Sequence, residues 1–417
     1  MGKYRQISDI ASIISKNKLG RVLVLTGARQ VGKTTLVRKV LRDYHYISIE
    51  DPVSRESYLA LSAPQWRQLY PMAALDEVQK APRLIESIKA TYDSYDDVRY
   101  VLLGSSQLLL MEKVRESLAG RCVILEMFPL TLPELLSEGW EHPCTASPWQ
   151  QLLAQTGEEP ALLPSFLLDP QMPHKQRAWD YLLRFGGYPA LTDPALTDEE
   201  RYRWLANYVR TYLERDVRDL ANFRDLEPYT KLQRAVAVQT AQTYSLATLS
   251  RDASVSVKTV QRYLQYLSLS YQVLLLPAWD RNAGKRIAKA PKVHFMDQGV
   301  LQAVLQKRGG MTGAEFESVV VTELYKQARN AMAEVSFHHL RTQDGREVDL
   351  LVELPQGYYA FEVKMSQRVQ SSDARHLRDL QSFLDKPLLH SFLLSQDPRT
   401  QTFQPGITAV HAALFLS

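Results

Sequence analysis

The feature that most constrains this sequence is the stretch 27–35, which fits the phosphate-loop pattern G-x-x-x-x-G-K-[ST]. An apolar run at 22–26 precedes it and a helical pattern at 35–41 follows it. A glycine-rich loop between a strand and a helix turns backbone N–H groups toward an anion, so the stretch predicts a nucleotide phosphate site. The residues expected to line it are Gly27, Ala28, Arg29, Gln30, Val31, Gly32, Lys33, Thr34 and Thr35.

A second apolar run, 72–77, ends in Asp76 and Glu77. In phosphate-loop proteins the lysine contacts the β- and γ-phosphates, and the hydroxyl and an acidic residue hold Mg²⁺. We therefore assign phosphate contact to Lys33, the metal to Thr34 and Asp76, and activation of the attacking water to Glu77. ATP and Mg²⁺ are the expected cofactors. The alternatives are a chance turn before a helix and an Asp-Glu pair that caps the next helix.

Two further positions complete the expected nucleotide site. The run 99–106 ends in Ser105 and Ser106, either of which could sense the γ-phosphate, although a helix N-cap explains them equally well. Arg121, with Arg115 as a rival, follows this run and could act as an arginine finger on a neighbour's nucleotide. The alternative for Arg121 is a surface salt bridge.

The 417 residues predict several domains. Strand-like runs at 21–26, 45–49, 72–77 and 99–106 alternate with helical patterns, which predicts an α/β parallel sheet over 1–138. Six prolines between 143 and 173 indicate a linker or insertion at 139–173. The apolar spacing of 174–235 predicts a helical lid.

Residues 236–298 predict a winged helix-turn-helix, with the break at 254–256. The second helix would turn Lys258, Thr259, Gln261, Arg262 and Gln265 outward, and these residue types contact phosphates and base edges in DNA. The following wing carries a basic group that suits the DNA backbone, namely Arg281, Lys285, Arg286, Lys289 and Lys292. The alternative is a lid or protein-interaction module that moves with the nucleotide state.

Residues 299–417 predict an α/β domain similar to the PD-(D/E)xK nucleases. Asp349 lies in one strand-like run, and Glu362 and Lys364 lie two apart in the next, hence on one face. A preceding helix offers Glu317, with Glu323 as a rival. The expected metal ligands are Glu317, Asp349 and Glu362, with Asp349, Glu362 and Lys364 as the catalytic set. The alternative is a degenerate fold that binds without cutting.

The chain resembles a large prokaryotic family of AAA+-type ATPases that carry a C-terminal domain of unknown function, DUF4143. The matching segments are 27–35, 75–82, 102–110, 116–135, 185–191, 204–217, 246–268, 289–300, 316–324 and 345–364. The resemblance implies an AAA+-like P-loop core that assembles as a ring or another homo-oligomer, with Arg121 as the finger. It does not reveal what the C-terminal domain does.

Composition constrains the expected partners and cellular compartment. The net charge of +4 is compatible with DNA binding without requiring it, and no apolar run is long enough to span a membrane. The two cysteines exclude a disulfide framework, so we expect a cytoplasmic protein. The leading hypothesis is an ATP-hydrolysing AAA+-type protein that acts on branched, forked or broken DNA, with nuclease chemistry left open. The alternatives are a nucleotide-gated DNA-binding regulator and a signalling ATPase that binds proteins.

Overall fold

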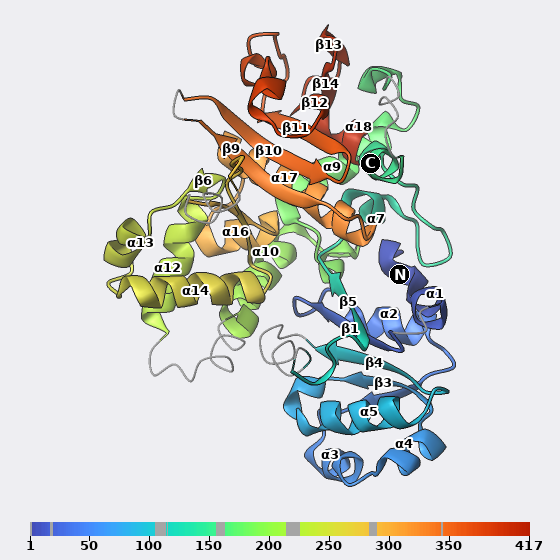
Figure 1. The fold of residues 1–417 in the computed structure, drawn as a ribbon. Helices are drawn as coiled ribbons and strands as arrows, with labels where there is room; N and C mark the ends of the chain where they lie inside the picture. Colours follow the sequence, from blue (N-terminus) through green and yellow to red (C-terminus); the bar gives the residue numbers. More distant parts are fainter. Residues whose placement is uncertain are drawn as a thin grey trace.

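The computed structural model describes residues 2–16, 20–104, 114, 116–155, 163–213, 226–282, 290–342 and 345–417. Figure 1 shows a blue N-terminal sheet at one end of the molecule, an orange and red C-terminal sheet at the other, and a yellow helical module beside them. Among the described residues, no helix is long and apolar enough to cross a membrane.

The N-terminal sheet is parallel, in the order β2-β3-β4-β1-β5. Its strands are β1 (Val22–Gly27), β2 (His45–Ser48), β3 (Met72–Asp76), β4 (Arg99–Gly104) and β5 (Cys122–Met127). Its helices are η1 (Gln6–Asp9), α1 (Ile10–Lys16), α2 (Lys33–Val40), α3 (Pro52–Leu59), α4 (Ala63–Leu69), η2 (Val78–Lys80) and α5 (Arg83–Ser94). The parallel α/β core predicted from the alternating runs is confirmed, with β5 as an additional edge strand.

The proline-rich stretch after this sheet contains regular structure where it is described. Its elements are α7 (Leu132–Leu136), α8 (Pro148–Ala154), η3 (Phe166–Leu168) and the start of α9 (Met172–Phe185). Trp149 of α8 is fully buried, and its indole N–H donates to the Leu324 carbonyl at 2.9 Å. Its ring lies edge-on to Phe361, with the centroids 5.4 Å apart. The segment is thus docked on the C-terminal part of the chain.

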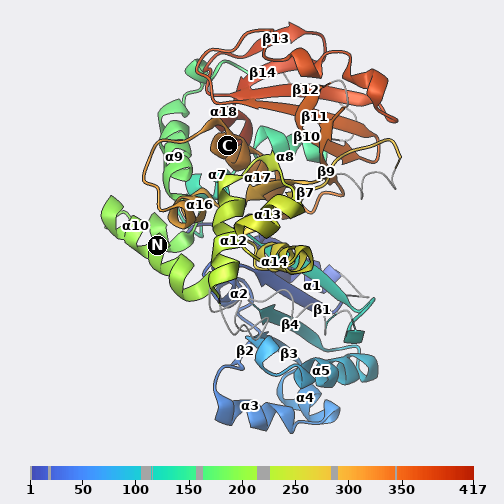
Figure 2. The same cartoon turned by 90° about the vertical axis from the view of Figure 1, so that its left-hand side faces the viewer.

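The middle of the chain is largely helical (Figure 2). Its elements are η4 (Pro189–Thr192), α10 (Asp198–Tyr208), the π-helical turn η5 (Val209–Leu213), α12 (Glu227–Val238), β6 (Gln242–Thr243), α13 (Leu246–Asp252), α14 (Val257–Leu269), β7 (Val273–Leu276), β8 (Lys292–Phe295) and α16 (Gln298–Leu305). Helices α13 and α14 pack together across a turn in which Ser254 has a φ of 55°. The three strands form an antiparallel sheet in the order β6-β8-β7.

The C-terminal part has a mixed six-stranded sheet in the order β13-β14-β12-β11-β10-β9. Its elements are α17 (Gly313–Asn330), β9 (Ser336–Arg341), β10 (Glu347–Leu354), β11 (Gly357–Lys364), η6 (Arg375–Leu377), η7 (Leu380–Phe383), β12 (Leu388–Ser395), β13 (Gln401–Gln404), β14 (Ile407–His411) and α18 (Ala412–Leu416). Strands β10 and β11 form the antiparallel hairpin that the sequence predicts, with Leu350 opposite Phe361.

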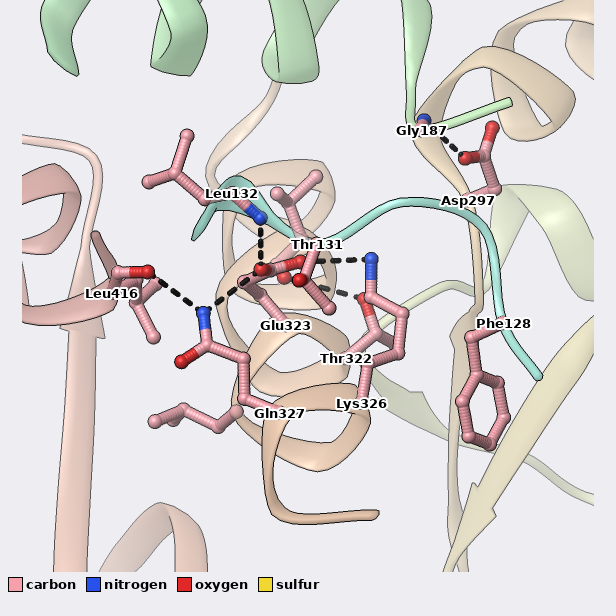
Figure 3. Close-up of polar contacts among 12 residues, drawn as sticks. Phe128, Thr131, Leu132, Gly187, Asp297, Thr322, Glu323, Lys326, Gln327 and Leu416 are labelled. Carbon is pink, nitrogen blue, oxygen red and sulfur yellow. Dashed lines mark hydrogen bonds and ion pairs between the residues drawn. The ribbon is translucent and has the colours of Figure 1, made fainter. Parts of the chain in front are cut away.

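A buried polar junction joins α7, α17 and the last residues of the chain (Figure 3). Glu323 of α17 is fully buried, and its carboxylate accepts from the Leu132 N–H at 2.6 Å and pairs with Lys326 at 2.8 Å. Gln327 donates both to Glu323 and to the Leu416 carbonyl. Glu323 therefore holds the start of α7. Its carboxylate is engaged there, so Glu323 is not the metal ligand that the sequence offered as a rival to Glu317.

Candidate nucleotide site and a second carboxylate cluster

The phosphate loop lies between β1 and α2, and its two glycines are structurally required. Gly27 has a φ of 152°, and a Cβ there would lie 2.1 Å from the Met127 carbonyl oxygen. Gly32 has a φ of 99°, in the left-handed region that other residues seldom adopt. The Lys33 ammonium is buried within the loop and donates to the Gly27 and Ala28 carbonyls, each at 2.8 Å. The loop thus closes on its own lysine.

Asp76 ends β3 directly beside the loop. One of its carboxylate oxygens accepts from the Thr34 hydroxyl and from the Tyr46 hydroxyl, each at 2.6 Å, and the other accepts from the Glu77 N–H at 2.9 Å. Burial and the Asp76 carboxylate raise the pKa of Tyr46 to about 12. Glu77 has a φ of 56° and accepts from the Gln79 amide at 2.6 Å. The two residues assigned to Mg²⁺, Thr34 and Asp76, therefore touch.

These residues fit Mg²⁺ and a nucleotide. A hydroxyl and a carboxylate are the hard oxygen ligands that Mg²⁺ takes while retaining waters and phosphate oxygens. The loop precedes the N-terminus of α2, which adds partial positive charge. Ser105, the expected γ-phosphate sensor, lies outside the described residues, directly after the end of β4.

Arg121 lies on the surface, in the turn before β5. Its guanidinium pairs with Asp93 at 2.7 Å, and both side chains are about one-third exposed or more. Within one chain Arg121 thus makes the surface salt bridge that the sequence offered as its alternative role. The rival Arg115 lies outside the described residues.

Two tyrosines from the middle of the chain reach the loop, and the sequence does not assign them this role. The Tyr208 hydroxyl donates to the Arg29 carbonyl at 3.2 Å and accepts from the Tyr188 hydroxyl at 3.0 Å. The Tyr271 hydroxyl lies 2.5 Å from that of Thr26, at the end of β1. The helical spacing of Tyr208 correctly indicates burial but cannot name the partner. The nucleotide loop is therefore held in part by residues outside the N-terminal sheet.

The second cluster lies in the C-terminal sheet. Asp349 of β10 accepts from the Val363 N–H at 2.9 Å, and the Lys364 ammonium lies 2.6 Å from Glu362. The hairpin thus brings together the predicted Asp349, Glu362 and Lys364. They line a cavity of about 310 Å³, whose other walls are Glu347, Ser372, Asp373, Arg375 and His376. Burial and the Asp349 carboxylate raise the pKa values of Glu317 and Glu362 to about 8 each.

A lysine lies among these carboxylates. The Lys292 ammonium is 2.9 Å from Glu317, 2.9 Å from Glu347 and 3.4 Å from Asp349, and only 2% of its side chain is exposed. Burial would lower its pKa, but the surrounding carboxylates raise it above the ordinary value. In the described part of the chain, no group of three or more His, Cys, Asp or Glu residues is arranged to hold a metal ion. The cluster therefore does not fit the metal expected of Glu317, Asp349 and Glu362.

Lys292 also corrects the predicted basic wing, since it is buried against acidic residues rather than turned to solvent. The Arg281 guanidinium donates to the Leu384 carbonyl at 3.0 Å. Lys285, Arg286 and Lys289 lie outside the described residues. On α14, Lys258, Gln261, Arg262 and Gln265 are exposed as predicted, whereas Thr259 is half-buried beside the Ser256 cap.

Three family models match the chain. An AAA domain matches residues 19–136, a domain of unknown function (DUF8612) matches 176–309, and a domain of unknown function (DUF4143) matches 312–415. The second model spans both the predicted lid and the predicted helix-turn-helix.

Similar chains include uncharacterized proteins of Mycobacterium tuberculosis and Mycobacterium bovis, each 30% identical over 360 residues that cover 82% of this chain and 70% of the relative. An uncharacterized protein of Methanocaldococcus jannaschii is 23% identical over 297 residues, which cover 65% of this chain and 61% of the relative. Among solved structures, a Walker-type ATPase of Pyrococcus abyssi aligns with a TM-score of 0.47 at 15% identity, covering 73% of this chain and 98% of that one.

Proposed function

Because the chain belongs to the family of AAA-type P-loop ATPases that carry a C-terminal DUF4143 domain, we propose that it binds and hydrolyses ATP with Mg²⁺ between its phosphate loop and Asp76. The observation that carries the proposal is the 2.6 Å contact between Thr34 and Asp76. A hydroxyl from the loop and a carboxylate from β3 meet there beside a buried lysine, as Mg²⁺–nucleotide binding requires.

Each residue then has a task. The loop N–H groups and Lys33 bind the phosphate oxygens, and Thr34 and Asp76 hold the ion, which neutralises phosphate charge when bound. Glu77 orients the attacking water and takes its proton, and the hydrogen bond from Gln79 fixes the direction of its carboxylate.

An ATPase assay tests this proposal. Lys33→Ala should abolish turnover by weakening nucleotide binding, whereas Glu77→Gln should keep binding and lower kcat by about 10²-fold or more. Lys39→Ala and Glu86→Gln, at exposed positions on α2 and α5, are matched controls that should keep the full rate. Full activity in both site variants would refute the assignment.

We further propose that Arg121 acts on the nucleotide of a neighbouring copy in a homo-oligomer. Mixing Lys33→Ala with Arg121→Ala should then restore turnover, because each protein supplies what the other lacks. Asp93→Ala is the control, since it breaks the surface pair and leaves the guanidinium in place. If Asp93→Ala loses as much activity as Arg121→Ala and mixing restores nothing, the arginine serves only its own chain.

As the target of the ATP cycle we propose DNA, with branched, forked or broken forms as the class to test. The exposed face of α14 supports this, because Lys258, Gln261 and Arg262 lie on the second helix of the α13–α14 pair, where helix-turn-helix proteins carry the side chains that contact DNA. Gel shifts over a DNA panel should weaken in Lys258→Ala/Arg262→Ala and with rising salt, and should be unchanged in Lys231→Ala, an exposed lysine on α12.

Strand cleavage is not part of this proposal, because Lys292 lies among the carboxylates that a nuclease metal would need. That observation favours the alternative in which the C-terminal domain binds without cutting. Mg²⁺-dependent cleavage that is lost in Asp349→Ala would establish the nuclease. Absence of any DNA shift would favour a protein-directed regulator.

A further inference from the structure

The carboxylate cluster already contains a cation, and it comes from a different part of the fold. Glu317 lies on α17 and Glu347 and Asp349 on β10, whereas Lys292 begins β8 in the small sheet that follows the helix-turn-helix. An ammonium group has three donors, and three carboxylates lie within 3.4 Å of Lys292. Its hydrogen-bonding capacity is therefore met within the cluster.

We propose that Lys292 is the resident cation of this cluster, and that its ammonium group takes the place of a divalent metal ion and keeps one out. This inference goes beyond the proposed ATPase and holds whether or not the chain binds DNA.

The contacts of Asp349 show how exclusion works. One of its oxygens faces Lys292 at 3.4 Å, and the other accepts from the Val363 N–H at 2.9 Å, so both are engaged. A dication bound to Asp349 would lie a few ångströms from the buried ammonium and would be repelled by it. One oxygen of Glu317, the helix carboxylate expected to complete the metal site, accepts a hydrogen bond from the same ammonium.

The cluster also contains a carboxylate oxygen, on Glu362, that is available to a cation once Lys292 is removed. One Glu362 oxygen meets Lys364 at 2.6 Å, while the other is buried and has no hydrogen-bond partner. Glu362 is 5% exposed and, with Asp349, lines the cavity of about 310 Å³. Removing the ammonium should therefore convert the cluster into a site for a hard divalent cation such as Mg²⁺ or Mn²⁺.

Mn²⁺ binding to the full-length chain without nucleotide tests the proposal, by electron paramagnetic resonance of free Mn²⁺. Wild type should show no Mn²⁺ binding that the Asp349→Asn substitution removes. Lys292→Met should gain one, with affinity raised at least about tenfold, and Asp349→Asn in that background should remove it. Lys326→Met is the matched control. It removes a different buried, ion-paired lysine, which lies on α17, and this variant should gain no Mn²⁺ site.

Lys292→Met could fail to fold because it leaves buried carboxylates uncompensated. The charge-balanced Lys292→Met/Glu347→Gln therefore runs beside it, with folding checked by circular dichroism. An Asp349-dependent ion in wild type would overturn the proposal. So would a folded charge-balanced variant that binds no Mn²⁺.

Discussion

The contact between Tyr208 and the phosphate loop gives the sharpest test of how the middle of the chain serves the nucleotide site. Tyr208→Phe removes one oxygen and keeps the ring stacked on Trp204, whose centroid lies 5.2 Å away. Two hydrogen bonds are lost: the one donated to the Arg29 carbonyl, 3.2 Å long and 179 residues distant in sequence, and the one accepted from the Tyr188 hydroxyl at 3.0 Å. Of these two bonds, the one to Arg29 is the one that reaches the loop.

A neutral hydrogen bond contributes about 0.5–1.5 kcal/mol, which corresponds to a loss of about two- to tenfold in ATP affinity if the bond holds the loop in its binding shape. The assay is a titration with a fluorescent ATP analogue. Tyr229→Phe is the matched control, because its hydroxyl, on α12, accepts an equally long bond from Gln272, directly before β7. Equal affinities for wild type and Tyr208→Phe, or an equal loss in Tyr229→Phe, would refute the reasoning.

Three further outcomes are expected. Glu323→Ala should lower the free energy of unfolding by about 3–5 kcal/mol in urea titrations, because it strands a buried ammonium, whereas the exposed Glu199→Ala should cost below about 1 kcal/mol. A pKa near 8 for Glu362 means that the folded chain binds this proton more tightly than the unfolded chain, whose value is near 4.5. The thermal midpoint should therefore fall as pH rises from about 5 to about 8, and less steeply in Glu362→Gln; equal slopes would contradict this. Gly187→Ala should lower the midpoint by several degrees in calorimetry, because its Cβ would lie 2.2 Å from a backbone carbonyl oxygen across the junction, whereas Gly313→Ala, with open space around it, should not.

The nucleotide site was predictable because its determinants are local. Two left-handed glycines, a lysine and a threonine lie within a few residues, and strand alternation then places Asp76 at the same end of the sheet. Three of the four residues assigned to chemistry there, Thr34, Asp76 and Glu77, lie within one set of hydrogen bonds. The role proposed for Arg121 requires a second copy, so no property of one chain decides it.

The long-range features were not predictable in the same way. Lys292 stands in a basic stretch, and only the fold reveals that it meets carboxylates 25, 55 and 57 residues further on. At 139–173 the prolines predicted a linker or insertion but not the regular structure within it. Pro148 instead occupies the first turn of α8, where its missing N–H costs nothing, and Trp149 anchors that helix.

Strands β7 and β8 of the small three-stranded sheet link the region of the phosphate loop to the carboxylate cluster. Tyr271, which touches Thr26 at the end of β1, lies two residues before β7, and β7 pairs with β8 so that Leu276 stands opposite Lys292. These contacts couple the nucleotide site to the carboxylate cluster only if β7 and β8 have two arrangements and bound nucleotide favours one of them. The Mn²⁺ titration repeated with ATP decides the matter, provided that only the Asp349-dependent part of the binding is compared and free Mn²⁺ is held constant, because ATP itself binds Mn²⁺. Asp349-dependent Mn²⁺ binding that appears with ATP and that Tyr271→Phe abolishes would make Lys292 a removable block. If no such binding appears with ATP, the Lys292 ammonium is a fixed part of the C-terminal core.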